Sequence, residues 1–138
     1  MLGLETKIRM KSQQKAIEQI IELAKADDSI EVVWLYGSRA KGTASDVSDY
    51  DLAIALNNKI NELKTDFYCE QLADEWSQQL ASPISIVDIN KIPTPLAYNV
   101  INEGVVIESN NDFRRHLEQQ RIWSLWENYE HEYERHRK

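Results

Sequence analysis

Two short apolar runs with a polar segment between them constrain the fold of this chain more than any other feature. Val32–Tyr36 and Tyr50–Leu56 are rich in β-branched, aromatic and aliphatic residues, which is typical of buried strands. Gly37 ends the first run, and Asn57 and Asn58 end the second. Strands of this kind must be covered on their apolar faces, so the sequence predicts a sheet with helices packed on it.

The rest of the chain supplies further strands and the helices that would cover them. Apolar residues recur at helical spacing before the first strand and again after the second. Pro95 suits the first turn of a short helix, and Gly104 suits its end. The expected fold class is α/β (α+β), a small mixed sheet with helices packed on it and a long C-terminal helix. The expected elements are helices over 5–26, 60–80, 95–101 and 112–136, and strands over 32–36, 50–56, 84–89 and 105–107.

Composition indicates a single domain and narrows the choice of partners. The 138 residues are enough for one core but not for two, so we expect one domain over 1–138, centred on about 31–107. The net charge of −7 disfavours direct binding to nucleic acid. A single cysteine, Cys69, excludes an internal disulfide and a multi-cysteine zinc site. Because the sequence shows no membrane span and no signal peptide, we expect a cytoplasmic protein with no membrane partner.

A glycine-rich turn over 37–42 follows the first strand. Gly37 lets the backbone turn sharply and approach a ligand closely. Backbone N–H groups, the Ser38 hydroxyl and the charges of Arg39 and Lys41 are all suited to binding phosphate. Taken alone, however, such a segment is more often an ordinary turn.

Two aspartates stand where the second strand begins. Asp49 and Asp51 are two residues apart, so in a strand both carboxylates project from one face. Such a pair is often a solvated strand end, but Asp51 leads directly into an apolar strand and would need a compensating cation. Asp88 interrupts the third strand, which by itself is typical of a strand end. If the two strands pair, three carboxylates converge near the glycine turn, the minimum arrangement for two metal ions acting on a phosphoryl group.

Together these features resemble a known family. The glycine–serine pair of the turn, followed after ten residues by Asp49-x-Asp51, is similar to the signature of the DNA polymerase β-type nucleotidyltransferases, with Asp88 in the place of their third catalytic acid. The sequences over 37–42 and 48–52 resemble in particular the minimal nucleotidyltransferases, abbreviated MNT. These are commonly the antitoxins of HEPN/MNT toxin–antitoxin pairs.

The resemblance implies an enzyme that transfers AMP from ATP to a hydroxyl group, with pyrophosphate leaving, and that uses two Mg²⁺ ions. Its catalytic and metal-binding residues would be Asp49, Asp51 and Asp88, with Asp88 beside the acceptor hydroxyl. The nucleotide would be bound by the glycine turn and the end of the loop after it, through Gly37, Ser38, Arg39, Lys41 and Ser48.

The resemblance leaves more than one function open. The first is an antitoxin that adenylylates a tyrosine hydroxyl of a cognate HEPN ribonuclease toxin, as a hetero-oligomer with it or a homo-oligomer. The second is a small-molecule nucleotidyltransferase of the antibiotic-modifying kind, but the segment after Ile107 is too short for a pocketed acceptor domain. The third is an antitoxin that binds its toxin without catalysis, and the intact acids argue against it. A transferase acting on RNA ends fits poorly with the acidic charge.

The C-terminal helix carries a stripe of apolar and aromatic residues at helical spacing. The stripe either packs on the protein's own sheet or, in its distal half, contacts the partner toxin or a second copy of the chain. The sequence leaves these two interpretations open. The stripe consists of Ile122, Leu125, Trp126, Tyr129 and Tyr133.

Overall fold

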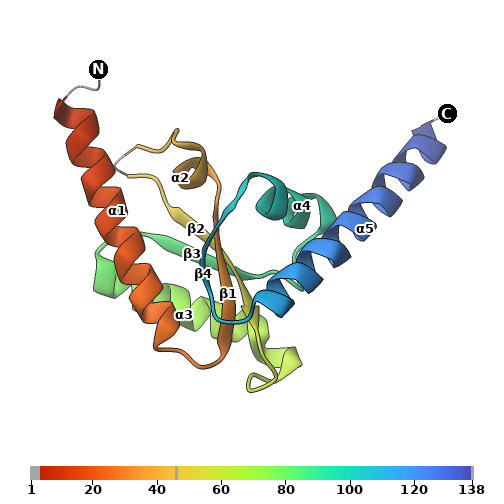
Figure 1. The fold of residues 1–138 in the computed structure, drawn as a ribbon, viewed down its shortest axis with the longest axis horizontal. Helices are drawn as coiled ribbons and strands as arrows, with labels where there is room; N and C mark the ends of the chain where they lie inside the picture. The colour runs from red at the N-terminus through yellow and green to blue at the C-terminus, as the bar shows by residue number, and fades with distance from the viewer. Residues whose placement is uncertain (1–3, 46, 138) are drawn as a thin grey trace.

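The computed structural model describes residues 4–45 and 47–137 and shows a four-stranded sheet between helices (Figure 1). In chain order the strands are β1 (Ile30–Tyr36), β2 (Tyr50–Leu56), β3 (Ile84–Asp88) and β4 (Val105–Ser109). They lie in the order β3-β2-β1-β4, so β1 and β2 are central. β1 is antiparallel to both of its neighbours, and β2 is parallel to β3, so the predicted mixed sheet is confirmed.

The helices follow the expected order, with small shifts at their ends. The predicted helix over 60–80 begins later, because a short 3-10 turn precedes it and the Asn61 side chain accepts a hydrogen bond from the Leu63 N–H. A short helix also forms within the glycine-rich turn. No helix in the described ranges has the length and apolar content needed to cross a membrane. The helices are α1 (Leu4–Lys25), α2 (Ser38–Lys41), η1 (Glu62–Lys64), α3 (Thr65–Leu80), α4 (Thr94–Glu103) and α5 (Asp112–Arg137).

Each face of the sheet has its own apolar core. α1 and α3 cover one face, where Ile20 and Trp76 pack with Leu52 and other strand residues. α4 and α5 cover the other face, where Val100 and Ile122 pack against the strands. β2 is therefore buried on both sides, and among its residues only Asp51, next to its start, is partly exposed to solvent.

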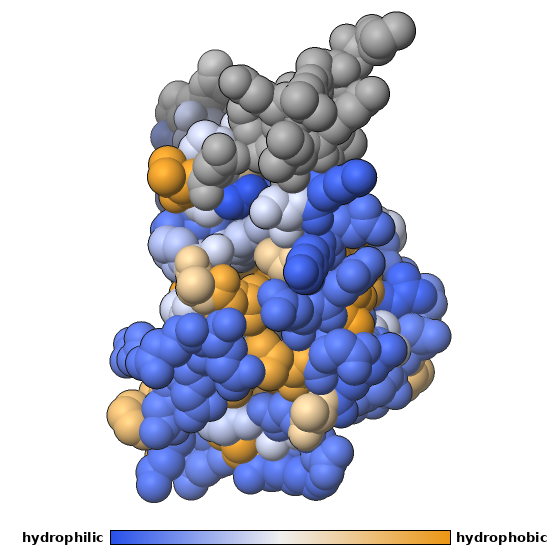
Figure 2. Space-filling view, turned by 90° about the vertical axis from the view of Figure 1, so that its left-hand side faces the viewer, coloured by the Kyte–Doolittle hydropathy of each residue, from blue (hydrophilic) through white to orange (hydrophobic). Residues whose placement is uncertain are grey.

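The surface on the side of α1 is mostly hydrophilic, with a strip of apolar atoms across its middle (Figure 2). A groove of about 440 Å³ between α1 and the end of α3 is lined in part by Leu23 and Leu80. This groove belongs to the α1–α3 face of the sheet.

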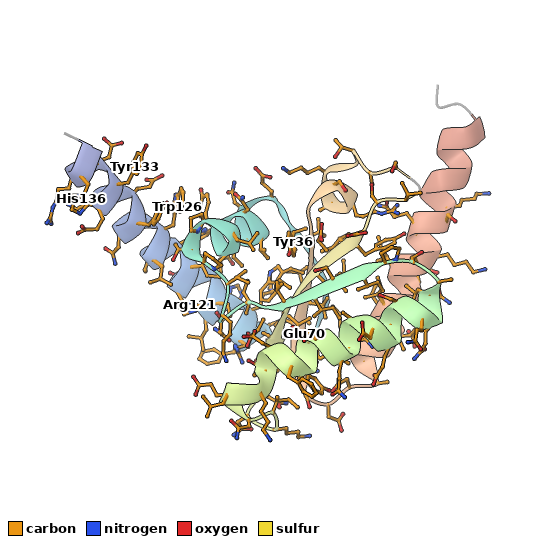
Figure 3. The ribbon with its side chains drawn as sticks, turned by 180° about the vertical axis from the view of Figure 1, so that it is seen from behind. Tyr36, Glu70, Arg121, Trp126, Tyr133 and His136 are labelled. Atoms are coloured by element: carbon orange, nitrogen blue, oxygen red, sulfur yellow. The ribbon has the colours of Figure 1, made fainter. Side chains whose placement is uncertain are left out.

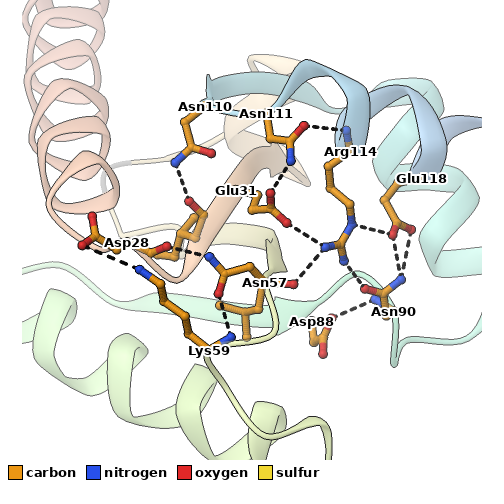
Figure 4. A network of polar contacts seen from close by, with 12 residues as sticks. Asp28, Glu31, Asn57, Lys59, Asp88, Asn90, Asn110, Asn111, Arg114 and Glu118 are labelled. Carbon is orange, nitrogen blue, oxygen red and sulfur yellow. Dashed lines mark hydrogen bonds and ion pairs between the residues drawn. The ribbon is translucent and has the colours of Figure 1, made fainter.

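A buried polar network fastens α5 to the sheet (Figure 4). The Arg114 guanidinium donates to Glu31 at 3.0 Å, to the Leu56 carbonyl at 2.9 Å and to Glu118 at 2.9 Å. Glu118, only 5% exposed, also accepts from Asn90. Burial opposes its charge, but the hydrogen bonds from Asn90, Arg121 and Arg114 outweigh burial and lower the pKa of this carboxyl.

Replacing Glu118 with Gln should lower the free energy of unfolding by about 1–3 kcal/mol at pH 7, because the half-buried Arg114 and Arg121 lose their charged partner. A carboxyl with a lowered native pKa stabilises the fold above its usual range and loses that effect as the pH falls through the native pKa. Urea unfolding should therefore show that the unmodified chain is more stable than Glu118→Gln at pH 7, and that this difference in stability is smaller near pH 4. Glu127→Gln, at an exposed position on the same helix, is the control.

Candidate active site

The turn after β1 is shaped by Gly37, whose φ of +72° and ψ of −156° are rarely adopted by residues with a side chain. α2 begins directly after it, and the N–H groups of Ala40 and Lys41 donate to the Gly37 carbonyl. A Cβ atom at position 37 would lie 2.5 Å from Oδ2 of Asp51. The glycine therefore leaves open the space that the Asp51 carboxylate occupies.

The two aspartates lie at the start of β2. Asp51 is half-buried, and Asp49 is exposed just before the strand. Burial raises the pKa of the Asp51 carboxyl, and the negative charge of Asp49 raises it further. Tyr36, the cross-strand neighbour of Asp51 on β1, has its pKa raised by burial and then by the charge of Asp51. The two carboxylates thus make one end of the sheet strongly anionic.

A pair of carboxylates that repel one another is a donor set that fits a hard divalent cation such as Mg²⁺. A cation bound to both would remove the repulsion that now raises the pKa of Asp51. Over 4–45 and 47–137, no group of three or more His, Cys, Asp or Glu side chains is placed to hold a metal ion. In the described residues, the carboxylates suited to a divalent cation are therefore those of the aspartate pair alone.

The prediction that Asp88 converges with this pair is wrong. β3 does lie beside β2, but the register pairs Asp51 with Ser85 and places Asp88 beside Ile54, three positions further along. Because a strand rises about 3.3 Å per residue, Asp88 lies about 10 Å away from Asp51 along the sheet.

Asp88 also lies on the other face of the sheet. Alternation along β3 points it the same way as Ile86, into the core under α1 and α3. Its Oδ1 accepts a hydrogen bond from the Asn90 N–H at 2.9 Å. Asp51 points with Ala53 toward the opposite core, under α4 and α5. Asp88 is therefore out of reach of a metal ion held by Asp49 and Asp51.

The structure does not bring Arg39 to the aspartate pair either. Its side chain is 6% exposed and lies over the Tyr50 ring, 4.2 Å from the ring centroid. The guanidinium donates to Oε1 of Gln13 at 3.1 Å and to the Ser48 carbonyl at 2.9 Å. Arg39 therefore ties the turn to α1 and to the loop before β2, which is a structural role that its charge alone did not indicate.

The other predicted nucleotide-binding residues lie around the turn. Ser38 is half-buried next to Gly37. The Lys41 ammonium forms an ion pair with Glu103 at 2.8 Å, and both side chains are about half exposed. The Ser48 hydroxyl accepts from the Ser45 N–H at 2.9 Å and so shapes its own loop. Ser38 and Lys41 therefore remain the candidates for contact with phosphate.

Sequence reasoning missed the two residues beside Asp51 in the sheet, Tyr36 and Ser85. Tyr36 lies at the end of β1 (Figure 3). The sequence did contain a signal for Tyr36, since it directly precedes Gly37 and an antiparallel hairpin places it opposite the start of the next strand. For Ser85 it contained none, because the register of β3 depends on the packing of α3.

Comparison with known proteins identifies one family. The family model described as "Polymerase beta, Nucleotidyltransferase" matches residues 18–113, which include the Gly37 turn and both aspartates. No curated protein matches the chain significantly.

Solved structures show the same fold at low sequence identity. A chain from a crystal structure of a toxin–antitoxin with AMP-PNP has a TM-score of 0.71 and 21% identity, over 84% of this chain and 90% of that one. A chain from a Shewanella oneidensis complex of tri-AMPylated HEPN toxin with MNT antitoxin has a TM-score of 0.68 and 20% identity, over 87% and 91%. A chain from the toxin–antitoxin MntA-HepT has a TM-score of 0.67 and 19% identity, over 86% and 91%. The family match spans more than half of the sequence and contains the site just described, so the chain belongs to the polymerase beta nucleotidyltransferase family.

Proposed function

We propose that this chain is an antitoxin that transfers AMP from ATP to a hydroxyl group, that of a tyrosine, on a HEPN toxin and so neutralises the toxin. The observation that carries the proposal is the aspartate pair Asp49–Asp51 beside the Gly37 turn, in a chain of the nucleotidyltransferase family. Two similar structures support it. One contains AMP-PNP, and the other contains a tri-AMPylated HEPN toxin with its MNT antitoxin.

In this proposal Asp49 and Asp51 hold Mg²⁺. When bound, the metal supplies positive charge to the triphosphate. Gly37 and Ser38 contact the terminal phosphates through backbone N–H groups and the hydroxyl, and Lys41 adds charge at the rim. The acceptor hydroxyl gives up its proton to solvent water and its oxygen bonds to the α-phosphorus, while the bond from that phosphorus to the bridging oxygen breaks, so pyrophosphate leaves. Because Asp88 lies on the other face, it does not take the acceptor proton.

The distal half of α5 is the proposed toxin-binding surface. The stripe packs on the sheet through Ile122, which is fully buried, but Tyr129 and Tyr133 are 45% and 58% exposed. Trp126 stacks between Tyr98 and Tyr129, at centroid distances of 4.4 and 5.4 Å. Figure 3 shows Trp126 and Tyr133 along a helix that leaves the body of the protein. A groove of about 440 Å³ is lined here by Trp126, Tyr129, Glu130, Tyr133 and Glu134.

Rigid aromatic residues beside carboxylates are suited to a partner with apolar and basic side chains. Truncating the chain after Asn128 should therefore weaken toxin binding by at least about 30-fold, because hot-spot residues of this kind each contribute about 2 kcal/mol or more. Isothermal titration calorimetry would measure this loss of binding. Thermal melting would measure stability, and the melting temperature of the truncated chain should fall only slightly. Tyr133→Ala should also weaken toxin binding. Glu132→Ala, which removes an exposed ion pair with Arg135, should bind the toxin normally. A large loss of stability with normal binding would instead assign this part of α5 to the core.

The proposed reaction is tested by following the two ends of ATP separately. The purified chain would be incubated with a HEPN toxin, magnesium and ATP labelled at either the α- or the γ-phosphate. The proposal expects α-label on the toxin and no γ-label. Transfer of γ-label would indicate a kinase, and the absence of any label on the toxin would contradict the proposed acceptor.

A further inference from the structure

A row of three side chains crosses the sheet at the end where the aspartates lie. Tyr36 on β1 and Ser85 on β3 are the cross-strand neighbours of Asp51 on β2. Neighbouring strands are about 4.8 Å apart and paired residues share a face, so the side chains of Ser85 and Asp51 project next to each other from the sheet. Ser85 is half-buried, as Asp51 is, which places both at the edge of the core.

The burial pattern of β3 independently assigns Ser85 to the same face as Asp51. Ile84, Ile86 and Asp88 are buried and alternate with the half-buried Ser85 and Val87. The first set belongs with the core under α1 and α3, whereas Val87 packs on the core under α4 and α5. Register and alternation thus agree that the residue next to the aspartate pair is a serine.

We propose that Ser85, and not Asp88, fills the third position of the site, so that the chain holds a single divalent cation with two carboxylates and one hydroxyl when no nucleotide is bound. This inference rests on the proposed function. Two divalent cations close together repel one another, and ligand charge count sets how tightly such ions are held. Asp49 and Asp51 supply enough negative charge for one ion, and the neutral Ser85 adds none. A second ion therefore requires the phosphate oxygens of the nucleotide.

The number of bound ions can be counted without any enzymatic reaction. Mn²⁺ would be titrated into the full chain without nucleotide, and the free ion would be measured by electron paramagnetic resonance. Only the Mn²⁺ ions whose binding is lost in the Asp51→Asn variant are counted as belonging to the site. We expect one such ion in the unmodified chain, and Ser85→Asp should add a second ion or tighten binding by at least about tenfold, because it adds a hard anionic ligand. Ser85→Asn introduces a side chain as large as aspartate but neutral, so it should neither add an ion nor tighten binding.

Asp88→Asn is the decisive control. Because Asp88 lies on the other face, this variant should bind Mn²⁺ as the unmodified chain does. If it loses binding as Asp51→Asn does, or if the unmodified chain binds two ions, the inference is overturned. These two measurements also decide the matter if Ser85→Asp does not fold. Failure of the proposed function is distinguishable, because it would appear as no AMP transfer by an unmodified chain that still binds one Mn²⁺ ion at Asp51. Undiminished Mn²⁺ binding by Asp51→Asn would overturn the inference itself.

Discussion

Replacing Asp51 with Asn is expected to reduce AMP transfer by more than about 100-fold while the protein remains folded. Loss of a residue that only supports a metal ligand already costs about 10–100-fold, and Asp51 is proposed to be a ligand itself. Asn has nearly the same shape but lacks the negative charge. Single-turnover transfer from α-labelled ATP to the toxin would measure the change.

The same variant should not lose thermal stability. Burial and the charge of Asp49 raise the pKa of the Asp51 carboxyl, so its ionised form is disfavoured in the fold at neutral pH. Removing that charge relieves the cost, and we expect a melting temperature equal to or above that of the unmodified chain. Asp88→Asn is the matched control, since its amide oxygen can still accept from the Asn90 N–H, and it should transfer AMP normally. Equal losses in both variants would contradict the site.

Gly37→Ala is expected to impair both stability and activity. The backbone conformation at Gly37 is strained for any residue with a side chain, which costs about 1–3 kcal/mol of unfolding free energy. The new methyl group would also lie 2.5 Å from Oδ2 of Asp51 and must displace that carboxylate. AMP transfer should therefore fall as far as in Asp51→Asn. Urea unfolding and the transfer assay would measure the two effects.

Gly42 provides the control that separates strain from displacement. Its φ is +75°, but a Cβ atom there would meet nothing within 4 Å. Gly42→Ala should therefore cost about 1 kcal/mol of stability through strain alone and leave the transfer rate nearly unchanged. If Gly37→Ala were no less active than Gly42→Ala, the close approach to Asp51 would not matter for the reaction.

The sequence was sufficient to predict the sheet, the order of its elements and the position of Asp49 and Asp51 at the start of a strand. It was not sufficient to place Asp88. β2 is buried on both faces, so its residues do not alternate and give no sign of which core Asp51 faces. The register of a parallel pair is set by the packing of the crossover helix, which periodicity does not reveal. Three carboxylates near strand ends therefore looked convergent when one of them faced the other core.

Arg39 and α5 show two further limits of the same kind. A cation in a glycine turn of an acidic protein is equally consistent with a phosphate contact and a buried anchor, and only the positions of Gln13 and Tyr50 distinguish them. Along α5 the apolar spacing continues past the point where the sheet ends. Helical periodicity indicates which side chains share a face, but the length of the neighbouring elements decides how many of them are covered.

The position of β1 between β2 and β4, with Arg114 fastened to Glu31, has a consequence for the order in which the protein can form during synthesis. Glu31 and Arg114 are 83 positions apart, so the central strand lacks one flanking strand and its polar clamp until most of the chain has been translated. Contacts of such long range slow folding, because the intervening chain must be closed first. Until β4 emerges, β1 presents an open edge, and a shortened chain that ends before Val105 should aggregate rather than fold.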